Sequence, residues 1–201
     1  MYLKSTVVLA LAVVCLLLTE TICVNPPPTE TFPNTLTLQA PDLSYLYWKA
    51  DAQSVTFEIH FKNSSKWFLF GLNGNTFSDV IVVWMNVDGT GHFSDRKLFT
   101  ANNQRTTTVD AVQNWRLIDA FVKDDYTVAK FRRPVRIVQC DPTNTDDLDI
   151  NEGNNNVVFA SGNSPNLADD SIPIASATLS NAQVNILNGW NTANLIISKV
   201  N

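Results

Sequence analysis

Three observations predict that this chain is an all-β protein folded as an antiparallel β-sandwich. Short segments rich in β-branched and aromatic residues recur along the sequence, with polar turns between them. Residues 78–96 form a hairpin pattern, in which an apolar run is followed by the turn sequence Asp88-Gly89 and a second short strand. No stretch shows the 3.6-residue apolar period of a helix over three turns. The 201 residues, of which 45% are hydrophobic, suffice for one well-packed domain.

The strands before and after this hairpin follow from alternation and turn residues. A short strand is expected at 36–38, followed by strands at 45–47 and 55–61. In 55–61, apolar residues alternate with polar ones such as His60, so one face of this strand is predicted to face solvent. Lys123-Asp124-Asp125 is expected to be the turn of a further hairpin. The remaining strands are expected at 67–71, 115–121, 126–131, 157–160, 184–187 and 195–197, and polar connections at 99–114, 141–156 and 161–173.

The N-terminal region is expected to direct export. Lys4 precedes an almost unbroken apolar stretch at 7–18, and small residues follow near Cys23, which is the layout of a secretory signal peptide. The alternative is an uncleaved signal anchor. We therefore divide the chain into a signal peptide at 1–23, a proline-rich leader at 24–35 and a sandwich domain at 36–201. The mature protein is expected to be secreted, with no transmembrane segment after cleavage.

Charge, cysteines and sequons restrict the class of protein further. The net charge is −5, and no basic cluster is longer than Arg132-Arg133, so nucleic acid is not expected as a partner. Cys140 is the one cysteine clearly inside the domain; it could pair with Cys23, remain a buried thiol or link two chains. Asn63 begins the one glycosylation sequon, Asn-Ser-Ser, on a predicted turn.

Six segments carry a resemblance to a known family: Tyr47-Trp48 with 55–61, 67–72, 78–84 with 88–89 and 93–96, 110–117, 130–134 with 140–141, and 184–187. In this order they resemble the DOMON domain. The resemblance is closest to the DOMON domain that precedes the catalytic domains of dopamine β-hydroxylase-like copper monooxygenases, and it spans roughly residues 43–188. It implies a two-sheet, immunoglobulin-like sandwich, which the pattern of the residues also predicts.

The resemblance does not imply monooxygenase chemistry in this chain. That reaction requires two copper sites built from several histidines and a methionine on later domains, whereas the chain contains two histidines in all, His60 and His92. No ordinary catalytic constellation stands out either. The chain is therefore not expected to be an enzyme by itself.

A cation site is the first candidate, and the resemblance supplies its ligands. In the monooxygenase relatives the matching region is suggested to hold a metal ion, which implies Asp79, the main-chain carbonyls of Val80 and Arg96, and Asn114 as ligands here. Asn114 stands where the family has a carboxylate, and this lowers the ligand charge that calcium favours. Asp95 or Asp110 could compensate. The alternative is that Asp79 only accepts main-chain hydrogen bonds and Asp95 pairs with Arg96 or Arg105.

Haem is the second candidate, because some DOMON relatives hold b-type haem between a methionine and a histidine. Met85 lies next to the Asp-Gly turn, His60 lies on the polar side of its strand, and His92 follows the hairpin turn. Neither histidine lies in the late strand where the haem-binding relatives place theirs. The sequence therefore does not favour haem.

A sugar or another small ligand is the third candidate. Trp67, Trp115 and Trp190 could stack on sugar rings beside the many asparagines, although aromatic residues of a sandwich are more often in the core. The acidic loop Asp146-Asp147-Leu148-Asp149 is expected to be solvated, or to bind cations loosely.

These observations favour a secreted, non-catalytic module that recognises an extracellular ligand or partner protein, with a structural calcium ion as the candidate cofactor. Two alternatives remain: a haem-binding electron-transfer module, and an accessory relative of the copper monooxygenases that acts with a separate catalytic chain.

Overall fold

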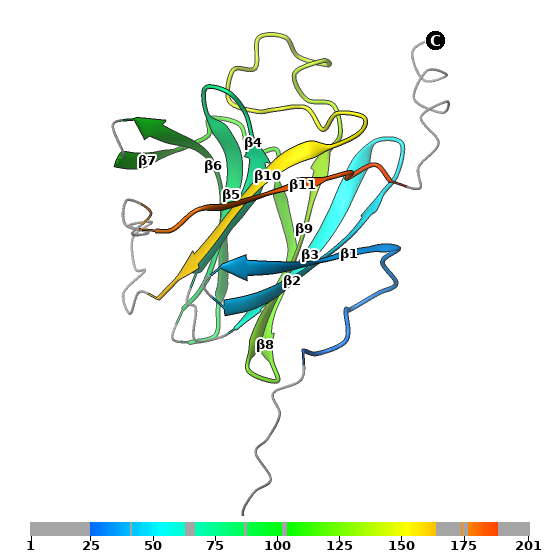
Figure 1. Cartoon of the computed structure of the whole chain (residues 1–201), viewed down its shortest axis with the longest axis vertical. Coiled ribbons are helices and arrows are strands. Elements are labelled where there is room, and N and C mark those ends of the chain that lie inside the picture. The colour runs from blue at the N-terminus through cyan, green and yellow to red at the C-terminus, as the bar shows by residue number, and fades with distance from the viewer. Residues whose placement is uncertain are drawn as a thin grey trace, which may run out of the picture.

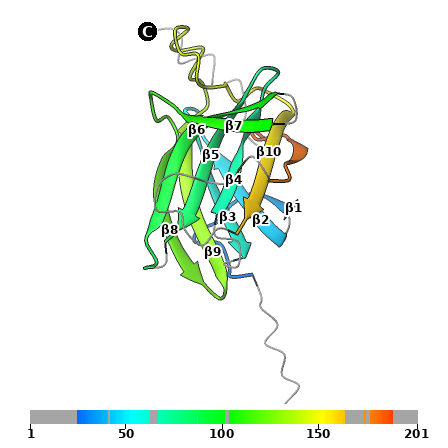
Figure 2. The same cartoon turned by 90° about the vertical axis from the view of Figure 1, so that its left-hand side faces the viewer.

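The computed structural model confirms the predicted antiparallel β-sandwich. It describes residues 25–40, 42–62, 67–86, 88–101, 104–163, 174 and 177–188, and within these no helix is long and apolar enough to cross a membrane. All paired strands are antiparallel. One sheet has the order β1 (Asn34–Ala40), β2 (Asp42–Ala50), β3 (Ser54–Lys62), β9 (Tyr126–Pro134) and β8 (Arg116–Lys123) (Figure 1). The other has the order β11 (Ser180–Val184), β10 (Asn155–Gly162), β4 (Trp67–Asn73), β5 (Ser78–Met85), β6 (Gly91–Ala101) and β7 (Gln104–Val109) (Figure 2).

The main core lies between the two sheets. Alternate residues of facing strands point inward and form one large apolar cluster. At its centre Phe57, Phe70, Trp115 and Phe131 pack ring against ring, with centroids 5.3–6.2 Å apart. Burial of these large side chains is the principal source of stability.

A second apolar cluster covers the outer face of the six-stranded sheet. It includes Trp67, Trp84 and Leu98 from the sheet, and Ile174 and Ala177 from the segment that follows β10. Strands β4 and β5 are consequently buried on both faces, which explains why they are almost continuously apolar.

Both predicted hairpins are present. Asp88-Gly89 joins β5 to β6, and Gly89 has a φ of 83°, a conformation that glycine adopts at little cost. Asp124 and Asp125 join β8 to β9 with φ values of 50° and 63°, which aspartate tolerates better than most residues.

Several strand boundaries differ from the prediction. The expected polar connection at 99–114 contains the end of β6 and all of β7, an edge strand whose threonines suit an exposed ladder. The strand expected at 184–187 ends at Val184, and the chain then turns, with the N–H of Asn188 bonded to the carbonyl of Asn185. The strand expected at 195–197 and the sequon at Asn63 lie outside the described residues.

The predicted solvent face of β3 is covered instead. Residues 25–32 of the expected leader pack on it, and His60 has no exposed surface. Asn25 Oδ1 lies 2.7 Å from His60 Nδ1, Glu58 Oε1 lies 2.8 Å from His60 Nε2, and the N–H of Thr29 donates to Glu58 Oε1 (2.8 Å). Glu30 pairs with Lys130 at 2.6 Å. The prediction of a surface histidine was wrong because alternation within a strand does not reveal a segment that folds back over it.

Candidate cation site

Asp79, near the start of β5, is fully buried although it carries a carboxyl group. Its Oδ1 accepts a hydrogen bond from the indole Nε1 of Trp115 (2.6 Å). Its Oδ2 accepts from Nη1 of Arg133 (2.8 Å) and from the main-chain N–H of Leu148 (2.9 Å). These donors satisfy both oxygens, as a buried carboxylate requires.

The ion pair between Asp79 and Arg133 joins the two sheets, because Arg133 lies on β9. Both side chains are fully buried, and the guanidinium also lies over the ring of Trp115, 4.6 Å from its centroid. Strand β4 approaches β5 closely here: a Cβ on Gly71 would lie 2.0 Å from the carbonyl oxygen of Asp79. Glycine at position 71 therefore permits the strand spacing that places Asp79.

Asp95, on β6, is held by the loop that precedes β8. Its Oδ2 accepts from the main-chain N–H groups of Asn114 (2.7 Å) and Trp115 (3.1 Å). Gln113 bonds in both directions with the main chain of Asp95, at 2.9 and 3.1 Å. The other carboxylate oxygen of Asp95, Oδ1, is buried and has no hydrogen-bond partner.

Asp147 comes from the acidic loop and is buried, not solvated as predicted. Its Oδ2 accepts from the side-chain amides of Asn114 (2.6 Å) and Asn144 (2.7 Å), while its Oδ1 is buried without a partner. The sequence holds a weak signal for this placement. Leu148 and Ile150 are apolar and pack against or within the core, which draws the loop inward.

The carboxyl groups converge from three separate segments of the chain. One oxygen each of Asp79, Asp95 and Asp147 lies within 4.8 Å of the others. Asp110, just after β7, is also buried, and neither of its carboxylate oxygens has a hydrogen-bond partner. Such buried oxygens cost free energy unless a proton or a cation satisfies them.

The pKa values of these carboxyl groups reflect that cost. Burial, followed by the charges of Asp79 and Asp147, raises the pKa of Asp95 to about 7, although hydrogen bonds from main-chain N–H groups oppose the shift. Burial and the charges of Asp95, Asp79 and Asp147 raise the pKa of Asp110 to about 8. The pKa of Asp147 is also raised, by burial and then by the charge of Asp79. The cluster therefore favours protons or a cation near neutral pH.

Comparison with known proteins identifies the family. The family model of the DOMON domain matches residues 42–162. The chain belongs to the DOMON domain family. No curated protein matches it.

Solved structures resemble this DOMON domain at low sequence identity. The cytochrome b domain of pyranose dehydrogenase from Coprinopsis cinerea is 14% identical, with a TM-score of 0.51 and coverage of 75% of this chain and 79% of that one. The cytochrome domain of Myriococcum thermophilum cellobiose dehydrogenase is 16% identical, with a TM-score of 0.49 and coverage of 89% and 98%. The first likeness shows a shared fold.

The ligands implied by the resemblance are only partly brought together in this DOMON domain. Asp79 lies in the cluster, and Val80 and Arg96 are directly opposite each other on β5 and β6. Asn114 contacts the cluster differently from the expectation, because its amide nitrogen donates to Asp147. Asp147 was missed as a candidate ligand.

The residues considered for haem lie apart. His92 stacks on Trp84, with centroids 5.2 Å apart, on the outer face of the six-stranded sheet. Met85 follows Trp84 and so belongs to the opposite face of the strand. His60 is buried on the outer face of the other sheet. Among the residues that the structure describes, no methionine and histidine therefore share one face of a sheet.

The other candidate residues are also placed by the structure. Trp67 and Trp115 are each 1% exposed, so they belong to the core, which was the alternative to sugar stacking, and cannot stack on a sugar ring. Trp190 lies outside the described residues. Cys140 is free and exposed, which overturns the alternative of a buried thiol; Cys23 lies outside the described residues.

Proposed function

We propose that this DOMON domain is an exported, non-catalytic binding module whose fold is completed by a divalent cation, best matched by calcium. The observation that carries the proposal is the convergence of buried carboxylate oxygens, several without partners, from β5, β6 and the 141–151 loop. All the ligand atoms offered are oxygens, which hard cations prefer, whereas zinc prefers nitrogen and sulfur. Export and glycosylation at Asn63 are part of the proposal.

Asp95 and Asp147 are the principal ligands in this proposal, because each has a buried oxygen available. Asp79 already accepts three hydrogen bonds, and its role is to fix the site to Arg133 and Trp115. The carbonyls of Val80 and Arg96 are further candidates, as the family resemblance implies. Asp147 supplies the carboxylate that Asn114 lacks, and Asn114 positions it.

The stability of the domain is expected to depend on pH and calcium together. The folded pKa values of Asp95 and Asp110, about 7 and about 8, exceed the ordinary 3.8. The folded state therefore binds more protons than the unfolded state between these values, and the free energy of unfolding in chelator should fall as the pH rises through 7 and 8. Calcium at about 100 times its Kd should restore about 2.7 kcal/mol. At one fixed calcium concentration the gain should be largest at pH 8, where fewer protons compete for the carboxylates. Urea unfolding with calcium and with chelator measures both effects.

Asp147→Asn should change the stability in chelator and the response to calcium in opposite directions. It removes one of the mutually repelling carboxylates, so the chelated protein should become more stable at pH 8 while its response to calcium is lost. Asp119→Asn, at an exposed position on β8, is the matched control and should change neither quantity. Equal unfolding curves with calcium and chelator at pH 8 would contradict the cation proposal.

A haem-binding electron-transfer module is the second candidate, and the shared fold with a cytochrome b domain supports it. This comparison corrects the expectation that haem is disfavoured, because a domain of this fold serves as a cytochrome. The residues of this chain nevertheless do not fit a methionine–histidine pair, since Met85 and His92 belong to opposite faces of β5 and β6. Of the two histidines, His92 is the partly exposed one. The residues of this chain therefore permit haem bound through His92 as its one axial ligand.

Haem binding has a direct spectroscopic test. Reconstitution with haem should give a Soret band near ~410 nm, lost in His92→Ala, if the electron-transfer function is correct. Met85→Leu should leave this band unchanged, because Met85 lies on the opposite face of the sheet from His92. A purified, haem-exposed protein without a Soret band eliminates this candidate and leaves the cation-completed module.

A further inference from the structure

The three carboxyl groups of the candidate cation site lie beneath the surface. Asp79 and Asp95 have no exposed surface, and Asp147 is 2% exposed. An ion from solvent can therefore reach them only where the groups between the surface and the carboxylates move aside. Two pockets in the described part of the chain border the segments that hold these carboxyl groups, and they differ in this respect.

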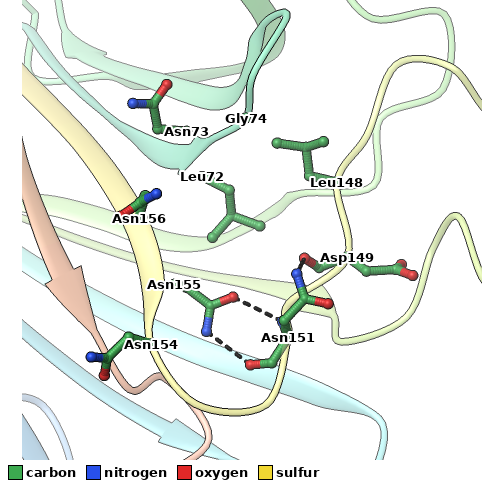
Figure 3. A pocket seen from close by; sticks show the side chains of 9 residues that line it. All are labelled: Leu72, Asn73, Gly74, Leu148, Asp149, Asn151, Asn154, Asn155 and Asn156. Carbon is green, nitrogen blue, oxygen red and sulfur yellow. Dashed lines mark hydrogen bonds between the residues drawn. The ribbon is translucent and has the colours of Figure 1, made fainter.

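The first pocket, of about 230 Å³, lies between the end of β4, the loop after Asp147 and the start of β10 (Figure 3). Its connection to the cluster is through the main chain, because the N–H of Leu148 donates to Asp79 at 2.9 Å. The loop is also fastened here, since the side chain of Asn155 exchanges hydrogen bonds with the main chain of Asn151 (Figure 3). A main-chain group in a fastened loop cannot rotate aside as a side chain can.

The second pocket, of about 220 Å³, lies between the loop before β8 and the segment after β9. Asn114 and Asn144 line it, and both are partly exposed. The side-chain nitrogen of each donates to Oδ2 of Asp147, at 2.6 and 2.7 Å. Two carboxamides therefore form the wall between this pocket and a buried carboxylate.

Asn114 is the movable part of this wall. Oδ1 of Asn144 accepts the main-chain N–H groups of Asp146 (2.9 Å) and Asp147 (3.0 Å), which hold that side chain in place. The side chain of Asn114 makes one hydrogen bond within the described part of the chain, to Asp147. Rotation of its carboxamide, a fast side-chain motion, replaces the nitrogen donor with an oxygen that calcium accepts as a ligand. The same residue can thus close the empty site and contact an incoming ion.

Cys140 and Arg136 line the same pocket. The thiol of Cys140 is free and exposed. Arg136 makes no ion pair within the described part of the chain, and its Nε is buried without a hydrogen-bond partner. A guanidinium binds carboxylates through charge-assisted hydrogen bonds, and an exposed thiol exchanges with small disulfides. The pocket therefore suits a small thiol that carries carboxylates, such as glutathione.

We propose that the second pocket is the entrance for the cation, and that a mixed disulfide between Cys140 and a small acidic thiol closes it. This inference rests on the proposed function and names the regulation of the same site. The thiolate of Cys140 attacks one sulfur of glutathione disulfide, and a new S–S bond forms as the bond within the reagent breaks. The second glutathione leaves as a thiolate and takes up the proton that Cys140 released, so no other oxidant is required.

The test compares the calcium kinetics of the secreted chain before and after exchange with glutathione disulfide. Stopped-flow mixing with an excess of a fluorescent chelator measures calcium release. Mixing of the chelated protein with calcium, followed by tryptophan fluorescence, measures uptake. Both rate constants should fall about 10-fold, which corresponds to a barrier higher by about 1.4 kcal/mol. The Kd should change by less than about 3-fold, because the added group does not contact the carboxylates. Dithiothreitol should restore both rates.

Matched variants and a neutral reagent serve as controls. Cys140→Ser should keep the rates of the unmodified chain and should not respond to glutathione disulfide. The neutral reagent 2-hydroxyethyl disulfide should also slow both rates, which separates the bulk of the added group from its charge. Arg136→Gln should lower the yield of the glutathione adduct about 2- to 5-fold, the scale of one exposed ion pair, and should leave the yield of the hydroxyethyl adduct unchanged.

The outcomes separate this inference from the cation proposal. Calcium binding with rates that modification of Cys140 does not change would overturn the entrance and leave the cation site intact. A weaker affinity caused by faster release alone would also overturn it, because the added group would then act on the bound state. The absence of any calcium response in the unmodified chain would refute the cation proposal and the entrance together. Purification of the chain as a dimer linked through Cys140 would overturn closure by a small thiol.

Discussion

Asp79→Asn is expected to lower the free energy of unfolding by about 3–5 kcal/mol, because it leaves the buried guanidinium of Arg133 without its ionised partner. Arg133 and Asp79 are both fully buried, so solvent cannot replace the lost charge. Relief of the repulsion with Asp95 and Asp147 offsets part of the cost, which places the expectation near the lower end of the range. Urea unfolding followed by circular dichroism measures it.

Asp119→Asn again serves as the control, since it removes the same charge from an exposed strand position. The change in pKa provides a second readout. Because the charge of Asp79 raises the pKa of Asp95, that pKa should fall in Asp79→Asn. A loss of stability no greater than that of the control would show that the ion pair between the sheets is not needed for the fold.

Trp115→Ala is expected to have a comparable or larger effect, about 3–5 kcal/mol for the cavity alone. Trp115 lies among Phe57, Phe70 and Phe131, and its indole also donates to Asp79 at 2.6 Å. Trp115→Phe retains the aromatic packing but loses this hydrogen bond to a charged group, at a cost of about 1.5–3 kcal/mol. Unfolding midpoints of the two variants separate packing from hydrogen bonding.

Trp48 provides the matched control. Its indole Nε1 donates to the carbonyl of Ile186 at 3.0 Å, a bond between neutral groups. Trp48→Phe should therefore cost about 0.5–1.5 kcal/mol, less than Trp115→Phe. Equal losses in the two phenylalanine variants would mean that the charge of Asp79 adds nothing to the bond with Trp115.

The sandwich and its hairpins could be predicted from the sequence because local signals determine them. Alternation at 55–61 and the turn residues Asp88-Gly89 and Asp124-Asp125 act over a few residues, and the structure contains all three features. Strand β7 was missed because its threonines and polar neighbours resemble a loop when the pairing with β6 is unknown. Edge strands are defined by their partners more than by their own composition.

The carboxylate cluster could be predicted only in part. The family resemblance located Asp79, and Asp95 was recognised as a compensating carboxylate, but Asp147 is 68 residues from Asp79 in the sequence and no local pattern brings them together. The buried state of His60 was missed for the same physical reason. The position of Asp147 and the burial of His60 both depend on a segment that packs against a strand distant in the sequence. The periodicity of apolar residues reports only local structure and does not reveal such contacts.

Residues 25–32, which cover Glu58 and His60, affect where the boundary of this domain should be placed. The family match begins at residue 42, after the whole of β1 and the stretch that shields these two polar side chains. A fragment cut at that boundary would expose the edge of β2 and let water reach the hydrogen-bonded Glu58 and His60, which are fully buried in the intact chain. Removal of the N-terminal residues through Thr29 by an aminopeptidase would also remove the two hydrogen bonds that Thr29 donates to Glu58.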